Sequence, residues 1–239
     1  MGCCGWTEAQ ARYVRDFAAI ELQSTFYDPP APAVARKWKA LAPPDFRFCM
    51  KAWQLITHTP ASPTYRKLRQ PVGAEERNLY GSFRQTEQVR LAWERTRQIA
   101  GILGAQVVVF QCPASFLPTR ENLRNFRAFF ADLERDGRML AWEPRGDEWQ
   151  PELVRDLCEE SALIHCVDPF KTEAMAGEAA YWRLHGRGGY RYRYTEEDFA
   201  ELSAMMRERA ELAGPNYVMF NNIYSLPDAA RFLDLYVRK

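Results

Sequence analysis

Residues 138–145, with the sequence RMLAWEPR, end an apolar stretch with a glutamate and an arginine. Side chains two residues apart in a strand point to the same face, so Glu143 and Arg145 share the face of Ala141. A carboxylate and a guanidinium are costly to bury unless they pair with each other or with a ligand. The stretch therefore predicts a strand whose inward face ends in a polar site.

Other apolar runs along the chain end in the same way. The run at 46–52 carries Cys49 and then Lys51 on one face, and the run at 179–186 carries Arg183 and then His185. Applied to every run, the two-residue spacing selects these polar or terminal inward positions: Glu21, Lys51, Gln111, Glu143, Arg145, Asp168, Arg183, His185, Phe220 and Asn222. The pattern predicts that polar groups gather at one end of a set of strands.

This predicted cluster contains both cations and carboxylates. Arginine binds phosphate or carboxylate through two parallel hydrogen bonds and lysine adds a point charge, so Lys51, Arg145 and Arg183 favour an anionic or phosphorylated small molecule. Glu21 and Glu143 are suited to act as general acid and base. The alternative is a set of ion pairs that satisfy one another without a ligand.

We predict catalytic roles for one part of the cluster and substrate contacts for another. The predicted catalytic residues are Glu21, Glu143, Lys51 and His185. The predicted substrate-binding residues are Arg145, Arg183, Asp168, Gln111, His58, Trp6, Ser24, Tyr192 and Asn222. The expected reaction is of the hydrolase or isomerase type, and a glycosidase is disfavoured because the cluster is basic for a neutral glycan.

Some of the same side chains are of types that bind metal ions or form covalent adducts. His58, Glu143, Asp168 and His185 are acceptable metal ligands, but the chain has only three histidines and no H-x-H or H-E-x-x-H motif. A divalent metal is therefore possible but not favoured, and the cofactor is otherwise unknown. A Schiff base formed by Lys51 is a further alternative that ranks lower.

Residues 186–198, GRGGYRYRYTEED, interleave arginines with tyrosines. This composition suits stacking on nucleotide bases, and residues 64–77 add further basic side chains. A nucleic-acid-binding barrel, for example a phosphodiesterase like endonuclease IV, is therefore an alternative function. An extended segment with its tyrosines packed down explains the alternation equally well. A non-catalytic metabolite-binding protein is the third alternative.

Eight strand-like runs alternate with helical stretches that must position these side chains. The runs are 1–6, 18–23, 46–52, 106–113, 138–145, 162–169, 179–186 and 216–222, and helices are predicted at 8–17, 31–41, 82–103, 119–136, 196–213 and 228–237. Eight units of about thirty residues suit a single α/β (β/α)8 TIM barrel, whose active sites lie at the carboxyl ends of the strands. A doubly wound sheet is less well supported, because no glycine-rich phosphate motif follows the first run.

We predict one domain over 1–239, with irregular or missing helices and an elaborated loop around 53–81. The net charge of +1 argues against a global polyanion-binding surface. No apolar run approaches the roughly 20 residues of a membrane span, and no signal peptide or paired-cysteine motif is recognisable. We therefore expect a cytoplasmic protein with reduced cysteines and no membrane partner.

Short motifs along nearly the whole chain carry a family resemblance. They are CCGW (3–6), ELQSTFY (21–27), FRFCMKA (46–52), ITH (56–58), QCPASF (111–116), EPR (143–145) with Trp149, VD (167–168), RLHG (183–186) and FNN (220–222). In this order they resemble the YecE-like proteins, domain-of-unknown-function family 72. The resemblance implies a TIM barrel and supplies no established reaction. Cys4 and Gly146 depart from the family pattern, in which a small polar residue and the motif HPSW are usual.

Overall fold

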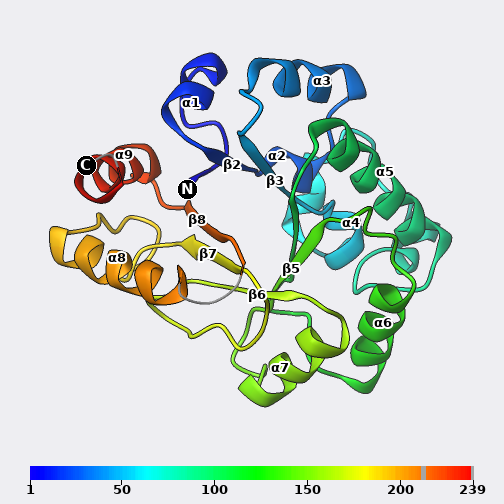
Figure 1. The fold of residues 1–239 in the computed structure, drawn as a ribbon. Helices are drawn as coiled ribbons and strands as arrows, with labels where there is room; N and C mark the ends of the chain where they lie inside the picture. Colours follow the sequence, from blue (N-terminus) through cyan, green and yellow to red (C-terminus); the bar gives the residue numbers. More distant parts are fainter. Residues whose placement is uncertain (211–213, 238–239) are drawn as a thin grey trace.

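The computed structural model describes residues 1–210 and 214–237. Within them, parallel strands pair in chain order and β1 closes onto β8, so that a closed barrel is surrounded by helices (Figure 1). The strands are β1 Gly2–Cys4, β2 Ala19–Leu22, β3 Arg47–Lys51, β4 Val107–Gln111, β5 Met139–Glu143, β6 Ile164–Val167, β7 Ala180–Leu184 and β8 Asn216–Phe220. The predicted TIM barrel is confirmed, and each predicted run contains one strand.

Helices cover the outside of the barrel, with one interruption. The longer ones are α1 Gln10–Asp16, α3 Pro32–Leu41, α5 Glu87–Leu103, α6 Arg120–Ala131, α7 Pro151–Glu160, α8 Glu196–Ala210 and α9 Ser225–Tyr236. Shorter helical segments are α2 Ser24–Tyr27, α4 Gln54–Thr57, η1 Pro63–Lys67 and η2 Ala74–Leu79, the last three lying within the long connection at 53–81. The connection between β6 and β7 contains no helix.

The helix predictions and the structure differ at α7 and at the end of α6, and one predicted helix extends past the described residues. Helix α7 was not predicted, because its apolar positions Val154, Leu157 and Cys158 span little more than one turn. The helix predicted to reach residue 136 ends at Ala131. The prediction was too long because the apolar spacing of the sequence continues into the turn that follows the helix. Of the helix predicted over 196–213, residues 211–213 lie outside the described part.

Two predicted helix ends are confirmed by their local geometry. Gly104 follows α5 with φ 62°, a left-handed conformation that glycine adopts without strain. At the start of α8, the amide of Asp198 donates to Thr195 Oγ1 at 3.2 Å and the amide of Thr195 donates to Asp198 Oδ2 at 2.8 Å. These reciprocal bonds satisfy two amides that the helix itself leaves without partners.

Buried apolar side chains form two layers, one inside the barrel and one between the strands and the helices. The inner layer includes Cys49, Val109, Ala141, Cys166 and Met219. Such small or unbranched residues leave room in the barrel for the charged side chains above them.

The side chains of the last strand, β8, point to the opposite faces from those predicted. Phe220 belongs to this layer, and its neighbour Met219 points into the barrel, where it pairs in register with Arg183. The prediction that Phe220 and Asn222 face inward was wrong. Both faces of the strand are apolar, so its sequence does not distinguish them.

Candidate active site at the barrel mouth

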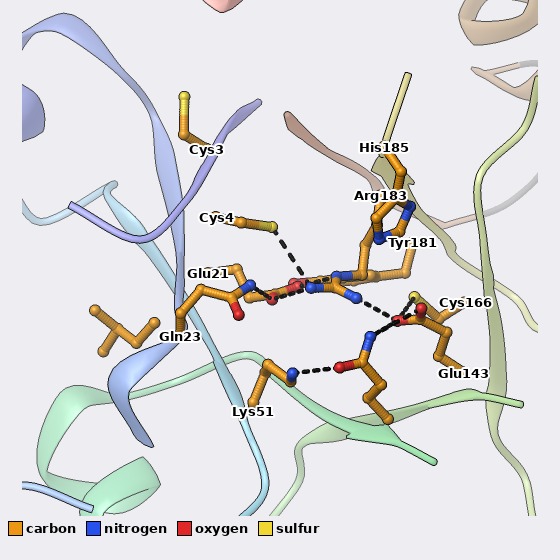
Figure 2. A network of polar contacts seen from close by, with 12 residues as sticks. Cys3, Cys4, Glu21, Gln23, Lys51, Glu143, Cys166, Tyr181, Arg183 and His185 are labelled. Carbon is orange, nitrogen blue, oxygen red and sulfur yellow. Dashed lines mark hydrogen bonds and ion pairs between the residues drawn. The ribbon is translucent and has the colours of Figure 1, made fainter. Parts of the chain in front are cut away.

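Arg183 is the centre of a buried polar network at the carboxyl ends of the strands (Figure 2). Its side chain is 1% exposed. Nε donates to Glu21 Oε2 at 2.9 Å and Nη2 donates to Glu21 Oε1 at 3.0 Å, while Nη1 donates to Glu143 Oε2. The guanidinium of β7 therefore joins carboxylates from β2 and β5, and burial of these charges is compensated by paired, directed hydrogen bonds.

Glu143 has further donors on its other side. Gln111 Nε2 lies 3.0 Å from both of its carboxylate oxygens, and Arg145 donates to Oε1 from Nε at 3.1 Å and from Nη2 at 3.0 Å. Burial alone would raise the pKa of Glu143, but Arg183 and Arg145 outweigh it and lower that pKa to about 2. Glu143 is therefore ionised at neutral pH and is a poor proton donor there.

Lys51 extends the network through an amide bridge. Its ammonium donates to Gln111 Oε1 at 2.5 Å and lies 4.0 Å from the centre of the Phe26 ring. Burial, together with the charge of Arg183, lowers the pKa of Lys51 to about 8. Lys51 is thus the member of the network that can change its charge near neutral pH.

The charges in this network do not cancel at neutral pH. The cations are Lys51, Arg145 and Arg183, and the anions are Glu21 and Glu143. One positive charge is therefore left over while Lys51 is protonated. A net cationic mouth favours an anionic ligand.

Several contributors to the network were missed from the sequence. Gln23 donates to Glu21 Oε1 at 2.6 Å and Tyr181 donates to Glu21 Oε2 at 2.9 Å. The thiols of Cys4 and Cys166 lie 3.9 Å from Arg183 Nη2 and Glu143 Oε2, respectively. Tyr181 lies two positions before Arg183 on the same face of β7, so the same spacing rule extended by one step would have found it. Gln23 follows the end of β2 and has a helical backbone conformation, so the rule does not place it.

Beside the network lies a cavity of about 440 Å³ at the carboxyl ends of β5, β6 and β7, which we call the β5–β7 cavity. Its charged lining consists of Glu143, Arg145, Asp168, Lys171 and His185. This volume is within the range of small-molecule sites in proteins. Four of the predicted site residues, all of these except Lys171, therefore share a space that a ligand can enter.

His185 is held at the edge of the β5–β7 cavity by Asp168. The Asp168 carboxylate accepts the backbone amides of His185 at 2.9 Å and Phe170 at 3.2 Å, and its Oδ2 lies 3.7 Å from His185 Nδ1. His185 Nε2 is buried without a hydrogen-bond partner among the residues that the structure describes. His185 also lines the cavity, so its ring has unused hydrogen-bonding capacity beside a space that a ligand can occupy.

Two predicted residues, His58 and Ser24, lie near the mouth but outside the network. His58 is buried with its ring edge against Phe26, and its Nδ1 is 2.8 Å from Thr57 Oγ1. Burial, with the charges of Lys51 and Arg145, lowers the pKa of His58 to about 3, so it is neutral. Ser24 is exposed at the first residue of α2.

The remaining predicted residues pack elsewhere. Trp6 lies against Tyr13 and Trp38, with ring centres 5.4 and 6.1 Å apart, in the helix layer. Asn222 donates to the backbone oxygen of Tyr192 at 2.7 Å and to Asp228 at 3.2 Å. The first of these bonds fastens the β7–α8 connection to the segment after β8, and the second joins that segment to α9.

The basic rim proposed for nucleic acid is partly neutralised. Arg187 pairs with Asp198 and Glu201 and stacks over Phe170, with its guanidinium carbon 4.3 Å from the ring centre. Within residues 64–77, Arg69 pairs with Asp28. These arginines have intramolecular partners, which reduces the charge available to a phosphate backbone.

The described part of the chain contains no group of three or more His, Cys, Asp or Glu side chains arranged to hold a metal ion. The six cysteines are free thiols. Over the same residues, every helix is too short or too polar to span a membrane.

The fold and this mouth define a single-chain TIM barrel with a buried ionic network beside a polar cavity. Residues 1–238 match the family model described as "Protein of unknown function DUF72". The chain belongs to this family, as its motifs predicted. No significant match is found among the curated proteins.

Solved structures of the same family, and others with different descriptions, have the same fold. A DUF72 family protein from Enterococcus faecalis V583 is 20% identical, with a TM-score of 0.72 over 97% of this chain and 91% of that one. A DUF72 family protein from Thermotoga maritima MSB8 is 21% identical, with a TM-score of 0.69 over 98% of each chain. A xylose isomerase domain containing protein from Salmonella typhimurium LT2 is 12% identical, with a TM-score of 0.60 over 99% of this chain and 95% of that one.

Proposed function

We propose that this protein is an enzyme, of hydrolase or isomerase type, that acts on a small organic anion in the β5–β7 cavity. The observation that carries the proposal is that His185, Arg145 and Lys171 line one cavity, and that Nε2 of His185 has no hydrogen-bond partner among the described residues. Arg145 is 45% exposed, so it can contact a ligand while it holds Glu143. His185 is the proton-transferring group, and Asp168 positions it.

The isomerase type has one further point of support. The name of the Salmonella neighbour includes a xylose isomerase domain, and sugar isomerisation depends on proton or hydride movement at a carbon next to a carbonyl. His185 beside an anion site supplies one proton acceptor for such chemistry. The likeness at 12% identity concerns the fold, so the proposal depends on the side chains of the cavity.

Anion binding is tested first with inorganic phosphate by isothermal titration calorimetry. Replacing Arg145 with glutamine is expected to weaken binding about tenfold or more, because a charge-assisted contact is lost. The matched control is Arg66→Gln, an arginine on η1 outside the cavity, and it should leave the affinity unchanged. Equal weakening by both substitutions, or phosphate bound only at the outer rim in a soaked crystal, would contradict the proposal.

Catalysis is tested by screening phosphate monoesters and hydroxy or keto acids for turnover. His185→Gln is expected to reduce turnover at least about a hundredfold, as removal of a general acid–base group does. The control is His58→Gln, which alters a histidine that does not line the cavity. Tight binding without any turnover by the wild type would instead favour the metabolite-binding alternative.

Lys51 provides a pH test of the net charge at the mouth. Because its pKa is about 8 and its neighbours include Arg183, Glu21, Glu143 and Arg145, the network loses its excess positive charge as the pH rises through that value. The affinity for sulfate, whose own charge is constant in this range, should fall roughly fivefold between pH 7 and 9.

The control for this test is Lys51→Met, which removes the titrating group and retains the length of the buried side chain. Its sulfate affinity should be lower at pH 7 and nearly constant up to pH 9. Parallel pH profiles for the wild type and K51M would refute a role for Lys51 in the charge of the site.

A further inference from the structure

The β5–β7 cavity has two chemically different ends. The charged side chains described above lie at the barrel mouth, whereas Trp149, Val154, Val167 and Met175 form an apolar lining. Val154 is on the first turn of α7, and Val167 is on the helix-facing side of β6. The cavity therefore continues from the mouth into the layer outside the barrel, between α7 and the connection from β6 to β7.

This extension exists because no helix covers β6 before the chain returns to β7. The connecting segment, 168–179, is instead held directly against the strand. The amide of Met175 donates to His165 Nδ1 at 3.1 Å, and the amide of His165 donates to the backbone oxygen of Ala176 at 3.1 Å. A segment of irregular backbone, narrower than a helix, takes the place of the usual helix and leaves space beside α7.

His165 adds no charge to the apolar end. Its Nδ1 accepts a hydrogen bond, so the proton of the neutral ring lies on Nε2. Burial lowers the pKa of His165 to about 4, which keeps the ring neutral at physiological pH. The outer end of the cavity is thus largely apolar, and its lining adds a neutral imidazole and the hydroxyl of Thr172.

We propose that the ligand of this site is an organic anion with an apolar chain or ring, whose charged group lies at Arg145 and Lys171 and whose apolar part lies against Val154 and Met175. The inference rests on the proposed function, because it assigns the second end of the same anion site. A cavity of about 440 Å³ is far larger than a phosphate or carboxylate group needs. The two linings match the two parts of such a molecule.

The proposal is tested with a series of defined probes: inorganic phosphate and methyl, ethyl, propyl and butyl phosphate, titrated at pH 7 by calorimetry. If each added methylene enters the apolar end, the affinity should increase up to about fourfold per methylene. The series separates the two ends, because the anionic group is the same in every ester.

Met175→Gln tests where the chain lies. This substitution preserves the size of a half-buried side chain and makes the apolar end polar, so the affinity gain per methylene should shrink while the affinity for inorganic phosphate stays the same. The matched control is Met206→Gln on α8, a half-buried methionine that does not line the cavity. It should retain the wild-type gain.

The outcomes distinguish this inference from the proposed function. Equal affinity for inorganic phosphate and all the esters would overturn the apolar end and leave the anion site intact. Identical gains in M175Q and M206Q would also overturn it, because the chain would then lie elsewhere. If no probe binds, including inorganic phosphate, the anion site itself is wrong and both proposals fail.

Discussion

Replacing Arg183 with methionine is expected to lower the free energy of unfolding by about 3–5 kcal/mol, since it leaves two buried carboxylates without their common cation. Glu21 is fully buried and bonded to two nitrogens of the guanidinium, and Glu143 is bonded to the third. Gln23 and Tyr181 would still donate to Glu21, but neither carries a compensating charge. Urea unfolding at pH 7 measures the difference.

Two further variants separate loss of charge pairing from loss of packing. The triple variant Glu21→Gln, Glu143→Gln, Arg183→Met removes all three charges and should recover much of the lost stability, because a neutral buried cluster is often no less stable than an ionic one. Arg90→Met, which breaks an exposed pair with Glu87 on α5, should change stability little. A loss in R183M no greater than in R90M would show that the buried pairing contributes little.

The pairing of Arg183 with two carboxylates limits the part that it can take in ligand binding. All three of its nitrogens already have acceptors within the network, two on Glu21 and one on Glu143. It is therefore better suited to fix the two carboxylates and supply positive charge than to bind substrate directly. Arg145, with its exposed side chain on the cavity, is the better candidate for contact with an anion.

Much of this network could be predicted from the sequence because it obeys a simple rule. Lys51 and Glu143 are the last residues of their strands, and Glu21 and Arg183 are the last but one. Each has an inner-layer residue two positions earlier, such as Cys49 before Lys51. Parallel strands in a closed barrel bring such positions to one end. Side-chain alternation and strand closure together were sufficient to place them.

The β5–β7 cavity could not be predicted in the same way. Its outer wall depends on Met175 and on the hydrogen bond from its amide to His165, in a connection without periodic sequence. Strand alternation places His165 on the helix side of β6, and no sequence rule indicated that a helix would be missing there. The opposite wall of the cavity is formed by α7, which was not predicted because its apolar pattern is short.

Acid is expected to destabilise the wild type more than a variant in which Glu143 is replaced by glutamine. The pKa of Glu143 is about 2 in the folded protein and near 4.5 in the unfolded chain. The unfolded state therefore binds the proton first as the pH falls, and the stability that this carboxylate contributes above pH 4.5 is lost between pH 4.5 and 2. Over that interval the wild type should lose roughly 3 kcal/mol more than E143Q.

Urea unfolding at several pH values between 6 and 2 measures this difference, and the comparison of slopes removes any constant cost of the substitution itself. Glu121→Gln, at an exposed position in the first turn of α6, is the control and should follow the pH dependence of the wild type. Coincident acid profiles for E143Q and the wild type would mean that Arg183 and Arg145 do not hold Glu143 ionised. The ion pairs of Glu143 at the barrel mouth would then contribute little to stability, and Arg183 and Arg145 would not lower the pKa of this carboxyl group.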